Sequence, residues 1–391
     1  RNFPVIGHFR YLFEHLGHFF RQYFFATDRE ELPFNRAERS WVYRAAKDVD
    51  TTAAFGSTRP HHETGTVIFV NGAFPTLKKN SEKSKPLIIG AECPNPYSAP
   101  SFFNVSAMSY GALSKPAVQA LSSGCKLAQC WLNTGEGGIS PFHLEGGCDL
   151  VAQIGTAKYG YRTLSGEFDE EKIKQAARYT QVKMFEIKLS QGAKPGKGGM
   201  LPAANVNEEI ANIRGIEPFQ DSISPNRFPE LNSVGDILDM IDYIRQLTEK
   251  PVGFKAVIGS SEWLHDLFGE ITKRGLSSAP DFITIDSADG GTGAAPMALL
   301  DYMGLHIRES LPLVVDMTKV YGLSERIKII ASGKLITPAE VAWALSVGAD
   351  FVNSARGFMF ALIVGVLVGT YSSVFVATPI MFDTLKKKFT S

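Results

Sequence analysis

The sequence predicts an α/β fold: a (β/α)₈ barrel of eight parallel strands, flanked by an N-terminal arm and a C-terminal apolar helix. Three observations favour this fold. Short apolar runs recur eight times after residue 101, and helical stretches lie between most of them. Such alternation is typical of a parallel sheet, and strands buried on both faces are continuously apolar. Eight is the number of strands that closes a barrel filled by its own side chains.

The expected strands are short and often end beside Gly or Ser. In chain order they are Phe102–Ala107, Cys130–Asn133, Val151–Ile154, Met184–Leu189, Val252–Ile258, Phe282–Ile285, Ile327–Ala331 and Phe351–Ser354. The expected helices between them are Lys115–Leu127, Glu170–Tyr179, Ser233–Thr248, Ser261–Arg274 and Pro338–Ser346. Thr337 before Pro338 is a typical helix start, with a capping side chain followed by proline at the first helical position. An open doubly wound sheet would instead need a Gly-x-Gly-x-x-Gly turn after its first strand, and residues 106–111 lack one.

Composition and segment type divide the chain into three parts. Residues 1–90 form the arm, with an aromatic helical stretch at His8–Phe25 and a strand candidate at Thr66–Val70. Residues 91–362 form the barrel, and residues 363–391 form the tail. A long insertion, Gln191–Asn232, follows the fourth strand at the carboxyl end, which is the catalytic face of such barrels.

The overall charge argues against a nucleic-acid partner, and the spacing of the cysteines argues against a metal site. The chain has 40 basic and 40 acidic residues, so it lacks the basic excess of a nucleic-acid-binding protein. Arg1–Arg21 lacks the apolar core of a secretory signal. The four cysteines have no C-x-x-C spacing, so we expect reduced thiols in the cytoplasm and no metal site.

Residues that could bind a ligand or act in catalysis follow the first, second and fourth strands. Met108 and Ser109 lie in a loop of small residues that would let a flat ring approach the backbone, although a simple turn before Ser114 is an equal alternative. Glu136 lies in a glycine-rich loop, where it would bind an ammonium group, transfer a proton, or simply be solvated. Residues 188–199 contain three lysines separated by glycines, which suits an anionic ligand.

Two lysines interrupt strands that are otherwise apolar. Lys188 and Lys255 would be costly there as unpaired cations, so we expect them near the mouth of the barrel; a structural ion pair is the alternative for Lys255. A glycine-rich loop, Asp286–Pro296, follows the sixth strand, and its exposed N–H groups can bind phosphate. The loops after strands seven and eight, with Gly333 and Arg356, are the usual phosphate site of this fold.

Five of these runs, taken together, resemble the FMN-binding domain of the glutamate synthase family, and the resemblance covers most of residues 1–362. The runs are Ser109–Ser114, Asn133–Gly138, Lys188–Gly199, Asp289–Pro296 and Ala355–Leu362. The resemblance implies FMN at the carboxyl-terminal mouth of the barrel. It also implies that 2-iminoglutarate, formed from 2-oxoglutarate and ammonia, is reduced to L-glutamate, with the flavin carrying out the redox step.

The resemblance also assigns roles to single residues. The residues expected to bind FMN are Met108, Ser109, Lys255, Asp289, Gly291, Thr292, Gly333, Ala355 and Arg356. Among them, Lys255 would lie near the pyrimidine edge of the flavin, and Gly333 and Arg356 near its phosphate. The residues expected to line the 2-oxoglutarate pocket and to act in catalysis are Glu136, Lys188, Gln191 and Lys194.

The chain departs from the family in three respects. It has no glutaminase domain before the barrel, so a separate subunit would supply ammonia, and another protein would donate electrons. The family's three-cysteine cluster after the eighth strand is missing, because residues 363–367 contain no cysteine, and an iron–sulfur cluster is therefore not expected. Beyond Leu362 the sequence no longer follows the family.

The tail resembles a membrane segment. Phe358–Phe382 carries no charge, is long enough to span a bilayer, and is followed by three lysines. Ala361–Pro379 resembles the last transmembrane helix of the SecD/SecF export family. The expectation is a cytoplasmic barrel anchored to the inner (plasma) membrane; the alternative is an apolar eighth helix of the barrel, although such helices normally have a polar face.

Other functions remain as alternatives. The missing cysteines and the unrelated tail are also consistent with a non-catalytic FMN-binding remnant, while a role in export is suggested only by the tail. FMN barrels that act on hydroxy acids would need a histidine base at a strand end. His143 and His306 lie well beyond their strands in the sequence.

Overall fold

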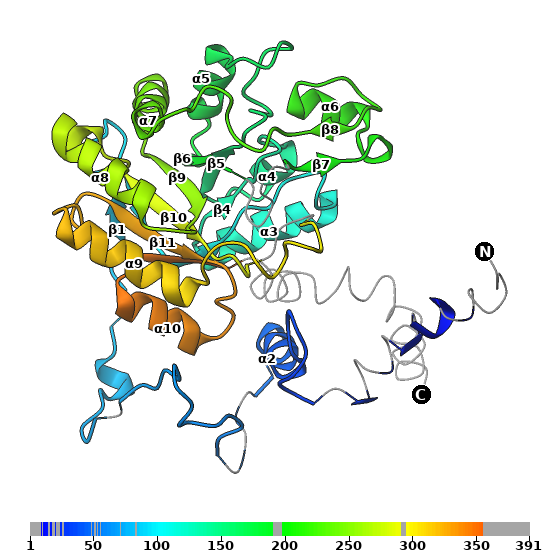
Figure 1. Ribbon diagram of the computed structural model, residues 1–391, viewed down its shortest axis with the longest axis vertical. Coiled ribbons are helices and arrows are strands. Elements are labelled where there is room, and N and C mark those ends of the chain that lie inside the picture. Colours follow the sequence, from blue (N-terminus) through cyan, green and yellow to red (C-terminus); the bar gives the residue numbers. More distant parts are fainter. Residues whose placement is uncertain are drawn as a thin grey trace, which may run out of the picture.

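In the computed structural model, eight parallel strands form a closed barrel, as predicted (Figure 1). The structure describes residues 84–190, 198–290 and 295–354 without a break. Before residue 84 it describes residues 9–82 except 10, 15, 18, 19, 21–23, 26, 48, 51, 53, 55 and 71. The predicted tail, residues 363–391, lies outside the described residues, and so does the expected C-terminal apolar helix. Within the described part, no helix is both long and apolar enough to cross a membrane.

The barrel strands are parallel and follow the chain order around the ring. They are β3 (Phe103–Val105), β4 (Leu132–Asn133), β5 (Leu150–Ile154), β6 (Val182–Lys188), β9 (Val252–Val257), β10 (Phe282–Asp286), β11 (Lys328–Ser332) and β12 (Phe351–Ser354). The ring closes where β12 pairs with β3. All eight predicted strands are confirmed, and their ends differ from the predicted ones by at most two residues.

Helices cover the outside of the barrel. They are α3 (Lys115–Ala128), α4 (Pro141–Glu145), α5 (Glu170–Arg178), α7 (Val234–Thr248), α8 (Glu262–Arg274), α9 (Ile307–Val320) and α10 (Pro338–Val347). Figure 1 shows α8, α9 and α10 lying along the outer side of β10 and β11. The five predicted helices are confirmed to within one residue at each end. Two of them begin with complete capping boxes, Ser233 with Asp236 and Thr337 with Glu340, which satisfy backbone N–H groups that a helix start leaves unpaired.

The insertion between β6 and β9 is partly ordered into its own small unit. It contains β7 (Met200–Leu201), a 3₁₀ turn (Ala203–Asn205), α6 (Glu208–Arg214) and β8 (Ser222–Ile223), with β7 antiparallel to β8. Helix α6 has an Asn207 cap at its start and Gly215 in a left-handed conformation at its end. This unit places α6 beside the loops that follow the first strands of the barrel, where its last residue becomes important for the site.

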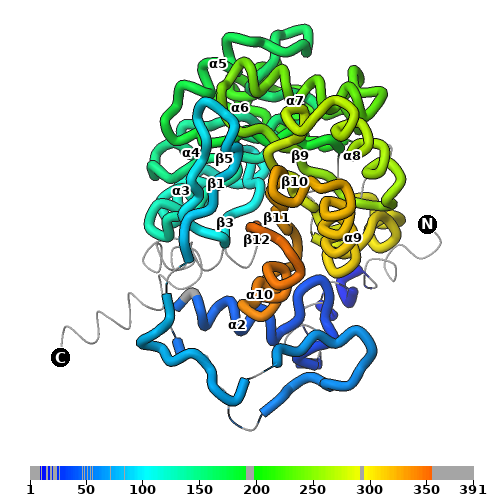
Figure 2. The backbone as a smooth tube through the Cα atoms, turned by 90° about the vertical axis from the view of Figure 1, so that its left-hand side faces the viewer, coloured from blue at the N-terminus to red at the C-terminus, as the bar shows by residue number. Residues whose placement is uncertain are grey.

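A hairpin closes the amino-terminal end of the barrel. It consists of β1 (Leu87–Ile89) and β2 (Tyr97–Ala99), and Figure 2 shows it lying across the end of the ring. Ile89 and Tyr97 pack in one buried cluster with Trp131 and Phe351 from the barrel strands and their approaches. Full burial of such a side chain contributes about 1.5–3 kcal/mol, so this end of the barrel is a packed core and not an entrance.

The arm differs from its prediction in one segment. Thr66–Val70 is not a strand: its side chains are largely exposed, and Val70 is 94% exposed. An extended run needs a neighbouring strand for its backbone hydrogen bonds, and the described residues provide none for it. The described residues of His8–Phe25 are helical, α2 spans Arg36–Ala46, and a 3₁₀ turn spans Lys78–Asn80. The domain boundaries at residues 90 and 362 stay predictions.

Candidate active site at the carboxyl ends of the strands

Strand register brings two of the predicted site lysines together at the mouth of the barrel. Lys188, the last residue of β6, is paired in register with Lys255 on β9, and Lys255 is paired with Thr284 on β10. Asp286, the last residue of β10, forms an ion pair with Lys255 at 3.4 Å between Oδ1 and Nζ. Parallel strands place their carboxyl ends on one edge, so residues far apart in the sequence meet here.

Lys255 is a buried cation with carboxylates around it. Its side chain is 8% exposed. Burial alone would lower the pKa of Lys255, but the carboxylates of Asp286 and Glu186 outweigh that effect and raise its pKa above the ordinary value. The ammonium group is therefore charged at neutral pH, and its charge faces the inside of the mouth.

Glu186 is a buried carboxylate that was not among the predicted site residues. Its Oε1 accepts hydrogen bonds from Asn133 Nδ2 at 2.7 Å and Gln153 Nε2 at 2.6 Å, and its Oε2 accepts one from Thr284 Oγ1 at 2.5 Å. These four side chains come from β4, β5, β6 and β10. Three donors and the charge of Lys255 stabilise an anion that would otherwise be costly inside the barrel. The sequence signal for this network was that each of its polar residues interrupts a strand that is otherwise apolar.

One atom of this network has no partner. Gln153 Oε1 is buried and accepts no hydrogen bond from the described residues. Buried acceptors in folded proteins are almost always paired, and an unpaired one costs about 1–3 kcal/mol. The carbonyl oxygen is therefore suited to an N–H group of a ligand bound at the mouth.

Glu136 and Lys188 form the second ion pair of the mouth. Their Oε2 and Nζ atoms are 3.4 Å apart, and both side chains are partly buried. Two glycines allow this approach. A Cβ on Gly155 would lie 2.5 Å from Glu136 Cβ, and a Cβ on Gly135, whose φ is +68°, would lie 2.6 Å from the Ser109 nitrogen. The loops after β3, β4 and β5 can therefore pack closely.

Arg214, the last residue of α6, adds a third cation near Glu136. Its guanidinium lies over the Tyr159 ring at 5.0 Å, and its Nη1 donates to Ser222 Oγ at 3.0 Å. Its Nε is buried and makes no hydrogen bond with the described residues. Burial lowers the pKa of Arg214, while Tyr159 and Glu136 act in the opposite direction. The sequence did not mark this arginine, because nothing in the pattern of α6 shows that the helix folds back over the mouth.

On the opposite rim of the mouth, Asp289 contacts two basic side chains. Its Oδ2 lies 3.2 Å from His306 Nδ1 and 3.4 Å from Lys334 Nζ. Burial tends to raise the pKa of Asp289, but the hydrogen bond from Ser287 and the neighbouring Lys334 and His306 side chains lower it overall. A Cβ on Gly333 would lie 2.6 Å from Ser287 Cβ, so only glycine lets the loops after β10 and β11 touch.

Both histidines lie closer to the strand ends than the sequence suggested. His306 contacts the loop after β10 through Asp289. His143, on α4, is fully buried, and its Nε2 lies 2.9 Å from the carbonyl oxygen of Met108 in the loop after β3. Both lie beyond their strands in the sequence, as expected, and the fold brings them back against the strand-end loops.

The buried His143 predicts a pH dependence of stability. Burial lowers the pKa of His143 from 6.5 to about 4, because the charged ring would be desolvated. The unfolded chain thus binds this proton more tightly than the folded one. Stability is therefore fully present above pH 6.5 and falls as the pH drops towards 4, by a total of about 3 kcal/mol. We expect urea denaturation at pH 7 and pH 4.5 to show this loss in the wild type and a smaller one in His143→Gln; equal losses in both would contradict the assignment.

Six predicted site residues fall in segments outside the described residues. They are Gln191, Lys194, Gly291, Thr292, Ala355 and Arg356. Seven are described: Glu136, Lys188, Met108, Ser109, Lys255, Asp289 and Gly333. These seven lie in the carboxyl-terminal halves of barrel strands or in the loops that follow them. In the described part of the chain, no three metal-ligating side chains gather into a group that could hold a metal ion.

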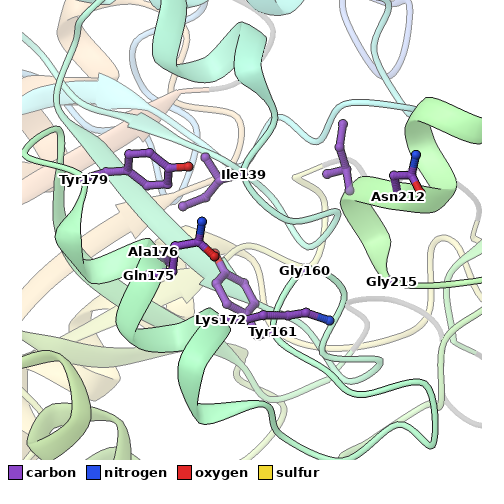
Figure 3. Close-up of a pocket in the computed structure, with 10 residues that line it drawn as sticks. Ile139, Gly160, Tyr161, Lys172, Gln175, Ala176, Tyr179, Asn212 and Gly215 are labelled. Carbon is purple, nitrogen blue, oxygen red and sulfur yellow. The ribbon is translucent and has the colours of Figure 1, made fainter.

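Two cavities lie near the barrel, and they differ in their relation to this mouth. One of about 710 Å³ borders Asp289, His306 and Lys334 and extends to Trp41 on α2 and Trp343 on α10. The other, of about 200 Å³, lies among α5, α6 and the loop containing Gly160 (Figure 3). It contains none of the predicted site residues. The strand-end geometry, and not this smaller cavity, therefore defines the candidate site.

Comparison with known proteins identifies the family. A family model for the conserved region in glutamate synthase matches residues 56–368. The chain belongs to the glutamate synthase family. The family match runs past Leu362 to residue 368, which corrects the predicted end of the resemblance. The matches give no support to the resemblance of the tail to export proteins.

Relatives within the glutamate synthase family differ in how much of them the chain covers. It is 42% identical over 401 residues to the glutamate synthase large subunit-like protein YerD of Bacillus subtilis, covering 93% of this chain and 76% of that protein. It is 31% identical over 260 residues to an archaeal-type glutamate synthase [NADPH] of Thermotoga maritima, covering 66% of this chain and 47% of that protein. The chain thus spans about half the length of the archaeal-type relative.

Solved structures similar to this glutamate synthase family member are more distant. A lactate oxidase of Pediococcus acidilactici is 16% identical with a TM-score of 0.46, over 75% of this chain and 74% of that one. A flavocytochrome b2 is 16% identical with a TM-score of 0.44, over 75% of this chain and 68% of that one. A likeness at this level does not extend beyond the overall fold.

Proposed function

We propose that the barrel is an FMN-dependent oxidoreductase of glutamate synthase type, which reduces 2-iminoglutarate to L-glutamate. The observation that carries the proposal is the convergence of Lys255, Lys188 and Glu136 at one mouth, in a chain of the glutamate synthase family. Such a mouth combines buried cations, which attract an anionic substrate, with a carboxylate that can hold a proton.

The residues at the mouth fit a flavin. The unpaired Gln153 Oε1 suits a ring N–H, Lys255 would interact with the electron-poor pyrimidine edge, and Gly135 and Gly333 keep the surrounding loops close-packed. The remaining residues proposed to hold FMN are Met108, Ser109, Asp289, Gly291, Thr292, Ala355 and Arg356. When bound and reduced, FMN would supply the hydride that the reduction requires.

The chain's own residues would bind the substrate and manage its proton. The two carboxylates of 2-iminoglutarate would pair with Lys188 and Arg214, and with Lys194 and Gln191 from the insertion. As the hydride adds to the imine carbon, the C=N double bond becomes a single bond and the nitrogen takes up a proton. Glu136, 3.4 Å from Lys188, is the carboxylate placed to hold and deliver that proton.

We also propose that other proteins supply the electrons and the ammonia. The names of the archaeal-type relatives include NADPH. This chain covers only 47% of each of those relatives, so the part that receives electrons from NADPH is proposed to reside elsewhere. The ammonia source is proposed in the same way to be a separate subunit.

The test is flavin reconstitution followed by an activity assay. The purified chain is titrated with FMN, and the reduced complex is given 2-oxoglutarate and ammonium under anaerobic conditions while glutamate is quantified. Absence of flavin binding would contradict the proposal. Stoichiometric FMN without any glutamate would instead favour the non-catalytic remnant.

A substitution at Lys188 tests the substrate pocket. We expect Lys188→Met to raise the KM for 2-oxoglutarate about a hundredfold, because the Glu136–Lys188 ion pair is lost and the substrate loses a charge partner. Lys319→Met is the matched control, because Lys319 pairs with Asp316 on the exposed side of α9. Equal KM values for the two variants would place the substrate elsewhere.

A further inference from the structure

The neighbours of His143 fix the tautomer of its neutral ring. Its Nδ1 accepts a hydrogen bond from the backbone N–H of Ser140 at 3.1 Å and lies 2.8 Å from Ser140 Oγ. Since Nδ1 is an acceptor, the neutral ring carries its proton on Nε2. Nε2–H therefore donates to the carbonyl oxygen of Met108 at 2.9 Å.

This contact fixes the orientation of the peptide between Met108 and Ser109. The Met108 N–H donates to the Asn133 carbonyl at 3.0 Å, so the residue is held on both sides. In a trans peptide the N–H points opposite to the preceding C=O. With the Met108 carbonyl directed at α4, the Ser109 N–H points away from α4. It makes no hydrogen bond with the described residues, and its nitrogen lies so close to Gly135 that a Cβ there would be 2.6 Å away.

We propose that His143 is a positioning residue for the flavin: it orients the Met108–Ser109 peptide so that the Ser109 N–H is available to an acceptor atom of the isoalloxazine ring. The inference rests on the proposed function, which places FMN at this mouth. His143 itself does not contact the ligand in this account. It acts through one carbonyl, and its effect on the ligand is the direction of one backbone donor.

A purely structural role for His143 makes different predictions. The same ring completes the capping box of α4, and its loss would lower stability whatever the ligand does. Ser122, on the neighbouring helix α3, offers a matched control. Its Oγ donates to the His143 main-chain carbonyl at 2.6 Å and accepts from the Gly146 N–H at 3.0 Å, without contacting the ring.

Two variants of His143 separate its two ring contacts. The amide of His143→Asn can replace Nδ1 towards Ser140 but is too short to reach Met108. The amide nitrogen of His143→Gln can take the place of Nε2 and donate to the Met108 carbonyl. Both are compared with wild type and Ser122→Ala in the full chain, by FMN dissociation constant, midpoint potential of the bound flavin, and thermal unfolding of the apoprotein.

We expect His143→Asn to weaken FMN binding about tenfold and to shift the flavin potential. His143→Gln should stay within about threefold of wild type, and Ser122→Ala should lose stability but keep both flavin properties. Wild-type FMN affinity and potential in His143→Asn would overturn the inference, as would equal changes in Ser122→Ala. If His143→Asn does not fold, a His143→Gln variant that folds and loses the wild-type potential also overturns it. A wild-type chain that binds no FMN would overturn the proposed function first.

Discussion

Replacing Lys255 with methionine is expected to weaken FMN binding more than a hundredfold, a large effect for a single side chain. Lys255 is the buried cation between Asp286 and Glu186, and its raised pKa keeps it charged at neutral pH. Without it, two carboxylates face the mouth uncompensated, and the negative field would repel an anionic flavin. Loss of a buried partner of this kind costs about 3–5 kcal/mol, which corresponds to a factor of more than a hundred. Quenching of flavin fluorescence in a titration measures the affinity.

Lys250 provides a matched control for this variant. It is also a partly buried lysine, but its Nζ donates to main-chain carbonyls, including Ala177 at 2.6 Å, before the start of β9. Burial lowers the pKa of Lys250 to about 8. We expect Lys250→Met to reduce stability without changing FMN affinity. If Lys255→Met binds FMN as the wild type does, the flavin does not lie against β9 and the assignment of the mouth is wrong.

The barrel was predictable because its strands and helices carry local signals. Strands buried on both faces are continuous apolar runs, and capping residues such as Ser233 and Thr337 mark helix starts. Helix α9 was not predicted, and its sequence signal is weak: Pro312 lies inside it, where proline normally argues against a helix. Strands β7 and β8 are two residues long, too short for any periodicity. Thr66–Val70 has strand-like residues, but strand formation depends on a partner, which a local pattern does not reveal.

A site residue could be predicted only where the sequence of its own strand is enough to place it. Lys188 and Lys255 could be placed at the mouth because each interrupts its own apolar strand. The pairing of Lys188 with Glu136 depends on the relative register of β4 and β6 and on the missing side chain of Gly155, which are tertiary properties. Arg214 and His143 reach the site from helices outside the barrel, so no pattern within their own segments marks them. The unpaired Gln153 Oε1 becomes visible only when its neighbours are known.

The opposite end of the barrel should be decisive for stability. Asp281, directly before β10, has a fully buried side chain. Its Oδ2 accepts from Arg245 Nε at 3.0 Å and from the Val252 N–H at 2.8 Å, and its Oδ1 accepts from Arg326 Nη1 at 2.8 Å. The aspartate thus ties α7, the start of β9 and the approach to β11 together at the amino-terminal face, where barrel residues serve stability rather than catalysis.

Asp281→Asn is therefore expected to lower the free energy of unfolding by about 3–5 kcal/mol, because two arginines lose the charge that compensates them inside the fold. Urea denaturation measures the loss. Asp239→Asn is the control, because Asp239 pairs with Arg274 at 2.5 Å on the surface, where such a pair contributes about 0–1 kcal/mol. FMN affinity should be unchanged in any Asp281→Asn protein that remains folded, since the substitution is at the end of the barrel away from the mouth. A loss no larger than that of Asp239→Asn would show that the two arginines find other partners and that the amino-terminal face does not depend on this carboxylate.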